Sequence, residues 1–144
     1  FFLNRPLIRE RGLDLEAMQQ RVQALALEYE GVFTAVTGTG LLRGNTSNDE
    51  ILERLRNGWS ASASGDVIIV PKPGWIQYSR SGTTHGSPFA YDTHVPLLFY
   101  GWHVPSGITY ERTYIRDIAP TVAALIHSPM PNATTGRPIE DLFD

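Results

Sequence analysis

The sequence predicts an α+β fold, and three observations support this prediction. Segments whose apolar residues recur at helical spacing alternate with short runs of β-branched residues. The connections between these segments are short, which favours helices packed on a sheet in a compact unit. The chain has 144 residues, of which 42% are hydrophobic. A chain of this length can bury about two-thirds of its unfolded surface, so a real core is possible.

The first half begins with a predicted strand and a predicted helix. The strand is Phe1–Asn4, because Pro6 lacks a backbone donor and biases the preceding residue towards extended conformations. The helix is amphipathic and spans Asp14–Tyr29. Its apolar residues recur at helical spacing, Asp14 is placed as an N-cap, and Gly31 follows as a stop signal.

Two strands and a second helix complete the first half. Val32–Thr37 is rich in β-branched and aromatic residues and predicts a strand. A helix over 51–58 is predicted next, capped by Ser47 or Asn48. Asp66–Pro71 predicts a buried strand. The first 74 residues are therefore predicted to run β-α-β-α-β.

A composition break at Lys72-Pro73-Gly74 opens the second half. The stretch from Trp75 to Asp92 is dense in Gly, Ser, Thr, Pro and aromatic residues and predicts an ordered loop. Val95–Gly101 is a continuous apolar run bounded by turn residues, as expected of a strand buried on both faces. Tyr114–Ile126 has helical spacing, with Pro120 either in the first turn or at a kink.

Composition excludes several classes of function. The net charge of −3 and the pI near 5.8 give no electrostatic reason to bind nucleic acid or an anionic membrane. The absence of cysteine excludes disulfides, thiolate metal sites and a cysteine nucleophile. No apolar run approaches the ~20 residues that span a bilayer. Because the chain opens in Phe-Phe-Leu without Met, we expect it to be cut from a longer protein.

The four histidines are candidates for metal chemistry, which needs several side chains converging on one point. His94 and His103 flank the strand predicted at Val95–Gly101. At ~3.3 Å per residue they would lie roughly 25 to 30 Å apart and could not share an ion. His127 ends a predicted helix, where an imidazolium favours the negative end of the helix dipole. A structural capping role is therefore expected for His127.

His85 differs from the other three histidines because it lies in a loop of small residues, Ser81–Pro88, just before a predicted buried strand. Small residues let backbone or ligand approach closely. Spacing alone leaves two roles open, a ligand or a loop histidine bonded to a backbone carbonyl. A serine-hydrolase role would use Ser87 or Ser81 with His85 and Asp92, but the sequence has no G-x-S-x-G elbow.

A glycine-rich stretch at Gly38–Gly44 has some features of a dinucleotide-binding fingerprint. Its last glycine falls one residue late, and Gly44-Asn45-Thr46 predicts a turn where the fingerprint needs a helix. We therefore predict a strand bulge and loop at Gly38–Gly44, with no cofactor bound there.

The run from Thr83 to Gly101 closely resembles the C-terminal segment of the alkaline phosphatase superfamily. The bacterial phosphate-irrepressible alkaline phosphatases are the most similar branch, followed by the type I phosphodiesterase and nucleotide pyrophosphatase branch. The resemblance extends over nearly the whole chain. It includes Phe2–Arg5, Asn57-Gly58-Trp59, Ser64–Val70, Pro73-Gly74-Trp75 and Asp117–Val122.

This resemblance implies a metal-dependent phosphatase. Enzymes of the family use two zinc ions, which stabilise the attacking and leaving oxygens while a Thr or Ser alkoxide attacks phosphorus. His85 aligns with the last histidine of the family pattern, which is the third protein ligand of one zinc. No metal role is implied for His94. The nucleophile and the other ligands do not occur here, since none of the seven aspartates is followed by histidine directly or four residues on.

The resemblance therefore implies the C-terminal part of a zinc-dependent hydrolase of phosphate monoesters, with a Thr or Ser nucleophile upstream. Residues 1–74 would form a small α+β sandwich subdomain, and residues 75–144 would form a C-terminal piece of the catalytic core. The isolated chain is expected to be inactive. Its expected partners are a phosphate ester and the N-terminal remainder, with no nucleic acid or membrane, in the periplasm or secreted. The alternatives are a phosphodiesterase or nucleotide pyrophosphatase of the same superfamily and a non-catalytic interaction module.

Overall fold

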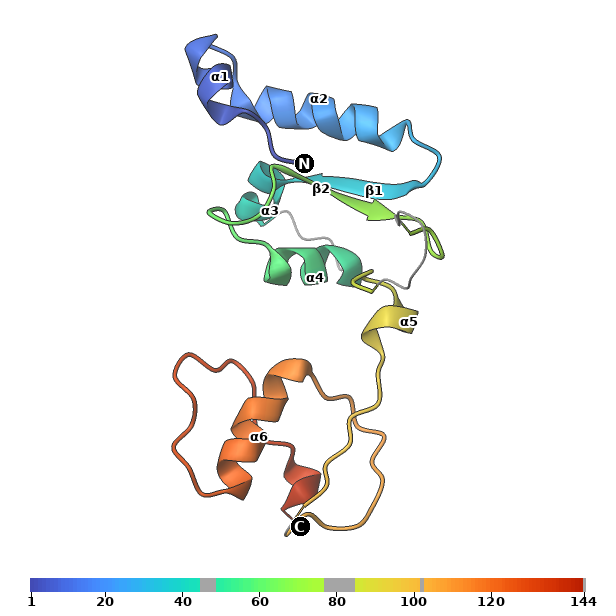
Figure 1. Ribbon diagram of the computed structural model, residues 1–144, viewed down its shortest axis with the longest axis vertical. Coiled ribbons are helices and arrows are strands. Elements are labelled where there is room, and N and C mark those ends of the chain that lie inside the picture. The colour runs from blue at the N-terminus through green and yellow to red at the C-terminus, as the bar shows by residue number, and fades with distance from the viewer. Residues whose placement is uncertain (45–48, 77–84, 102, 144) are drawn as a thin grey trace. The chain divides into compact units, whose positions relative to one another are not determined.

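The computed structural model describes residues 1–44, 49–76, 85–101 and 103–143 (Figure 1). The chain divides into two compact units, Phe1–Val95 and Pro96–Asp144. Helices and a two-stranded antiparallel sheet confirm the predicted α+β class. The boundary between these units differs from the predicted boundary between a subdomain at residues 1–74 and a catalytic-core piece at residues 75–144, which stays a prediction.

The first unit is built around strands β1 and β2, which pair in antiparallel register from Thr37 opposite Val67 to Val32 opposite Pro71, with an irregularity between Val32 and Thr34. Helix α2 packs on both strands, and α3 contacts β1 (Figure 1). The elements are α1 (Arg5–Glu10), α2 (Leu15–Leu27), β1 (Val32–Thr37), α3 (Gly38–Arg43), α4 (Glu50–Gly58), β2 (Val67–Pro71) and α5 (Ala90–Thr93).

The core of this unit confirms three of the predicted elements. The Asp14 side chain caps α2 by accepting from the Ala17 backbone N–H at 2.7 Å. The buried core consists of Ala26 from α2, Ala35 from β1 and Val67 from β2, with Val22 and Ile69 packed against them. These side chains are small, so α2 can approach the sheet closely.

The segment before α1 was predicted as a strand, and the structure corrects this. The Phe1 nitrogen donates to the Val67 carbonyl at 2.6 Å, and the Asp66 N–H donates to the Phe1 carbonyl at 2.7 Å, but no strand forms. Asn4 instead caps α1, and Pro6 lies in the first turn. There its missing N–H has no intrahelical partner to lose, so the proline favours the helix.

The stretch after β1 was predicted as a bulge and loop, but it forms helix α3. The Thr37 hydroxyl caps this helix by accepting from the Gly40 N–H at 3.1 Å, and Gly44 ends it at a φ of 67°. For α4, the caps predicted at Ser47 or Asn48 lie outside the described residues. The observed cap is Asp49, which accepts from the Ile51 N–H at 2.8 Å.

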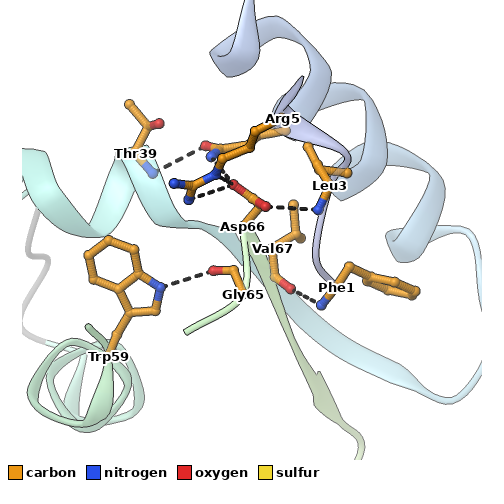
Figure 2. Close-up of polar contacts among 9 residues, drawn as sticks. Phe1, Leu3, Arg5, Thr39, Trp59, Gly65, Asp66 and Val67 are labelled. Atoms are coloured by element: carbon orange, nitrogen blue, oxygen red, sulfur yellow. Dashed lines mark hydrogen bonds and ion pairs between the residues drawn. The ribbon is translucent and has the colours of Figure 1, made fainter. Parts of the chain in front are cut away.

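A buried carboxylate, that of Asp66, joins the parts of the first unit (Figure 2). One of its oxygens accepts from the Leu3 N–H at 2.8 Å, and the other accepts from Arg5 Nε at 2.9 Å and from Gln19 Nε2 at 3.3 Å. Gln19, itself only 2% exposed, accepts from the Thr39 N–H at 3.2 Å. The N-terminal segment, α2, α3 and the start of β2 therefore meet at one polar cluster.

The surroundings of Asp66 have two opposing effects on the pKa of its carboxyl group. Burial raises the pKa of the Asp66 carboxyl, but the hydrogen bonds from Leu3, Arg5 and Gln19 and the Arg5 charge outweigh burial and lower it below its ordinary value. The ionised carboxylate is thus the form that stabilises the fold. This stabilisation is complete above the pKa of the unfolded chain and is lost as the pH falls through the folded pKa.

We expect Asp66→Asn to lower the free energy of unfolding by about 2 kcal/mol at pH 7, because charged hydrogen bonds are lost while Arg5 remains partly solvated. Denaturant unfolding between pH 7 and pH 3 measures this difference. The wild-type protein should lose more stability than the variant as the pH falls. The exposed carboxyl of Asp141 provides the control substitution Asp141→Asn. Parallel pH profiles for wild type and Asp66→Asn would contradict the role assigned to the cluster.

The second unit contains η1 (Ile115–Asp117), α6 (Ile118–Leu125) and η2 (Glu140–Leu142). The predicted helix is confirmed in α6, with a single 3-10 turn before it. The buried residues are Asp117, Pro120, Thr121 and Ala123. Two large apolar side chains of this region stay in solvent, since Ile115 is 86% exposed and Val122 is 41% exposed.

A second buried aspartate organises this unit. The two carboxylate oxygens of Asp117 accept from the Tyr114 N–H at 2.9 Å and from the Arg137 N–H at 3.1 Å. The Thr121 hydroxyl donates to the Asp117 carbonyl at 2.5 Å and accepts from the Ile139 N–H at 3.0 Å. The segment around residues 137–139 is therefore tied to the start of α6.

Thr121→Val should lower the free energy of unfolding by about 2 kcal/mol, because it removes both hydrogen bonds of the hydroxyl and leaves the Ile139 N–H without its acceptor. Chemical denaturation measures the loss. The exposed Thr135 gives the matched control Thr135→Val, which should change stability by less than about 0.5 kcal/mol. Equal effects of the two substitutions would show that the Thr121 hydroxyl contributes nothing.

The run Val95–Gly101 was predicted as a strand buried on both faces, and this is wrong for the chain described here. Its residues form neither helix nor strand. Leu98 is 88% exposed, Leu97 39% and Val95 62%. A strand needs partners for its backbone N–H and C=O groups, and the described residues offer this run no neighbouring strand.

Candidate functional site

The candidate ligand, His85, lies in the first unit on the segment that leads into α5, and it is exposed. The Thr83-Thr84 pair that precedes it in the family-like motif lies outside the described residues. Gly86 follows with a φ of 103°, which L-residues with a side chain rarely adopt. We call residues 85–94 the His85 segment.

Local hydrogen bonds give the His85 segment its shape. The Ser87 N–H donates to the Asp92 carboxylate at 2.9 Å, which closes a turn directly after His85. The Thr93 hydroxyl donates to the Phe89 carbonyl at 3.1 Å, and the His94 N–H donates to the Ala90 carbonyl at 2.8 Å. The turn and the short helix α5 are thus one bonded piece.

Aromatic contacts attach the His85 segment to the sheet. The Phe89 ring meets the ring of Phe33, on β1, edge-on with centroids 5.5 Å apart, and it stacks on Tyr91 at 5.9 Å. Such pairs contribute about 0.5–1.5 kcal/mol beyond the area they bury. The Tyr91 hydroxyl accepts from the Gly74 N–H at 3.2 Å, just after β2.

Arg54, on α4, makes a further attachment that the sequence analysis missed. Its Nη1 donates to the Pro88 carbonyl and, at 3.1 Å, to the Thr93 hydroxyl. Its Nη2 pairs with Glu50 of the same helix at 3.0 Å. The spacing of Glu50 and Arg54 predicts only their own pairing. Nothing in the sequence marks a contact with residues more than thirty positions away.

The Asp92 carboxylate is the titratable group whose surroundings are best defined in this segment. The Ser87 side chain and then the Ser87 N–H lower the pKa of Asp92 below its ordinary value, and a smaller lowering comes from the charge of His85. Asp92 is therefore ionised at neutral pH. The bond that the Ser87 N–H donates to this carboxylate at 2.9 Å gives Asp92 a turn-holding role. Ser81, the other serine candidate, lies outside the described residues.

Of the other three histidines, His94 ends the His85 segment, whereas His103 and His127 belong to the second unit. His94 is the C-cap residue of α5 and is exposed. His103 is exposed and has a φ of 62°. His127 follows the C-cap of α6 with a φ of 52°, and the N–H groups of His127 and Ser128 donate to the carbonyls of Ala124 and Ala123. This is a helix-ending motif formed by the backbone, so the position of His127 at a helix end is confirmed.

A complete metal site is not formed by the part of the chain that the structure describes. Within it, no three His, Asp or Glu side chains come close enough to hold an ion together. An exposed imidazole such as that of His85 fits one donor of a site whose other donors come from elsewhere. We therefore derive no chemical step through a metal from these residues.

The chain has sequence relatives among alkaline phosphatases. It is 37% identical over 136 residues to the alkaline phosphatase PhoV of Synechococcus elongatus and 32% identical over 143 residues to the alkaline phosphatase PafA of Elizabethkingia meningoseptica. These matches cover 94% and 99% of the chain but only 24% and 26% of those proteins. A calcium-transporting ATPase of Myroides odoratus is 39% identical over 94 residues, which is 64% of the chain and 17% of that protein. No protein-family model matches.

The three-dimensional comparison agrees with the sequence comparison. The crystal structure of wild-type PafA matches 99% of this chain with a TM-score of 0.89 at 29% identity, and the match covers 28% of that chain. The chain spans about a quarter of the length of these relatives. It is therefore a homologue of one part of the alkaline phosphatases PhoV and PafA.

The turn after His85 can be tested by following the Ser87 amide by NMR through an acid titration. Because the pKa of Asp92 is lowered, its bond to Ser87 persists to a pH below the usual carboxyl midpoint. We expect the Ser87 amide shift to titrate with a midpoint below 3.8. Asp92→Asn should abolish this titration. A midpoint at or above the ordinary carboxyl value would contradict the turn geometry.

Proposed function

We propose that this chain is the C-terminal part of a zinc-dependent phosphatase that hydrolyses phosphate monoesters. The observation that carries the proposal is the match to PafA, which extends over 99% of the chain with a TM-score of 0.89. The matches to PhoV and PafA in sequence support it independently. Since the chain spans only about a quarter of these proteins, the activity belongs to a longer polypeptide.

His85 is the residue through which this chain contributes to the reaction. Its imidazole is exposed, and the turn behind it is fixed by the bond between Ser87 and Asp92. In the longer polypeptide it is one ligand of a zinc ion, and the remaining ligands belong to the upstream part. Zinc supplies positive charge that stabilises the attacking and leaving oxygens of a phosphoryl transfer. The nucleophile, a Thr or Ser hydroxyl, also lies upstream, so the isolated chain is inactive.

The exposed apolar residues support the presence of an upstream remainder. Leu98 and Tyr100 are almost fully exposed, and Ile115 and Val122 project from α6 and the turn before it. Large apolar side chains with this degree of exposure are consistent with cover by another part of a longer protein. Residues 1–74 then form the α+β subdomain, and residues 75–144 form the piece of the catalytic core that carries His85. A free-standing interaction module would be expected to cover these side chains itself.

The proposed location of the longer protein is the periplasm or the extracellular space, by resemblance to bacterial phosphatases. Among the helices that the structure describes, none combines the length and the apolar character that a membrane crossing requires. The proposed substrate is a small phosphate ester.

His85→Ala in the full-length gene product should weaken zinc binding by more than about 100-fold, since loss of even an outer partner of a ligand costs about 10–100-fold. Turnover of p-nitrophenyl phosphate should fall with it, while the melting temperature of the metal-free protein should stay unchanged. Competition with a chromogenic chelator measures the affinity. His94→Ala is the matched control, because His94 is also an exposed histidine of the same segment.

Two outcomes would contradict the proposed function. One is a full-length product with no phosphatase activity towards monoesters in the presence of zinc. The other is a His85→Ala variant whose zinc affinity and turnover equal those of His94→Ala. Loss of zinc in both variants would show that the segment, rather than the His85 imidazole, determines binding.

A further inference from the structure

We propose that Arg54 is a positioning residue for His85, which it holds in place through the segment that follows it. The proposal rests on the proposed function of His85 as a zinc ligand. Under this proposal, α4 fixes the position of His85 although α4 itself supplies no zinc ligand. All the contacts involved lie within the first unit, Phe1–Val95.

The contacts of Arg54 meet the His85 segment just before α5, at Pro88, and at the end of α5, at Thr93. Its Nη1 donates to the carbonyl of Pro88, three residues after His85, and to the hydroxyl of Thr93, which closes α5. Between these two acceptors the chain turns through Phe89, whose ring packs on Phe33. One guanidinium nitrogen therefore joins the two ends of a short helix, so the helix and the turn carrying His85 move as one body.

The Arg54 side chain is itself held in place. It is two-thirds buried, with 33% of its side-chain surface exposed, and Nη2 pairs with Glu50 one turn earlier on α4. A guanidinium is planar, so a bond to Glu50 on one nitrogen fixes the direction of the bonds on the other. A lysine ammonium at this position would carry the same charge but could not hold the three acceptors in fixed directions.

Fixing the backbone after His85 matters because a metal ligand must keep its donor atom in place. The glycine after His85 has a φ of 103°, a conformation open to glycine because it lacks a side chain, so the backbone at this point is intrinsically free. The attachment through Arg54 limits this freedom by holding the backbone at Pro88 and Thr93. Groups that orient a ligand typically contribute about 10–100-fold to metal affinity.

The test compares Arg54→Gln and Arg54→Lys with His85→Ala in the full-length gene product. Arg54→Gln should weaken zinc binding about 10-fold, measured at 25 °C by chelator competition, and Arg54→Lys should weaken it less. The matched control is Arg43→Gln, which removes another surface arginine paired to one glutamate, Glu16, at 2.5 Å. It should leave zinc affinity unchanged.

Hydrogen exchange separates positioning from general loss of structure. In Arg54→Gln, faster exchange confined to residues 85–94 supports the proposal, and faster exchange throughout β1 and β2 contradicts it. If His85→Ala loses zinc but Arg54→Gln binds it as the wild type does, Arg54 does not position His85, and the proposed function stands. If His85→Ala keeps its zinc, the proposed function and this inference are both wrong.

Discussion

The carboxylate of Asp66 is the group on which the first unit depends. The apolar core cluster of that unit is small and consists of Ala26, Ala35 and Val67. The carboxylate compensates by accepting hydrogen bonds from the N-terminal segment and from α2, and Gln19 extends the cluster to α3. Because each partner lies on a different element, the positions of those elements are fixed together. The polar cluster around Asp66 therefore helps to fix the arrangement of the sheet and helices to which the His85 segment is attached.

The second unit is also organised by a buried aspartate, but the groups that donate hydrogen bonds to it are of a different kind. Asp117 is buried and accepts from two backbone N–H groups, but its described hydrogen-bond partners carry no charge. Asp66 has the Arg5 guanidinium as well. Oriented backbone donors can stabilise a buried carboxylate without a cation, provided that the chain around them is held rigidly. The contacts of Thr121 supply that rigidity in the second unit.

The sequence predictions were correct for elements determined by residues close in sequence and failed chiefly for features that depend on distant residues. Helix α2 and the strands β1 and β2 were predicted because Asp14, the apolar spacing and the β-branched runs act locally. Phe1–Asn4 was wrongly predicted as a strand, because Asn4 caps α1 and the chain enters that helix directly. Val95–Gly101 was wrongly predicted as a strand, because a strand exists only if another strand pairs with it. For the site, the assignment of His85 as a zinc ligand stays a prediction that rests on the family resemblance. Arg54 could not be found, since its partners at Pro88 and Thr93 are distant in sequence.

The order of the strands has a consequence for how the first unit assembles. β1 and β2 are neighbours in the sheet, yet the whole stretch with α3 and α4 lies between them in the chain. Closing so long a connection costs chain entropy before any ladder bond forms, so pairing of this kind is slow compared with a tight hairpin. Asp66 immediately precedes β2 and binds the segment before α1. The docking of β2 therefore also brings the N-terminal segment into place against the sheet.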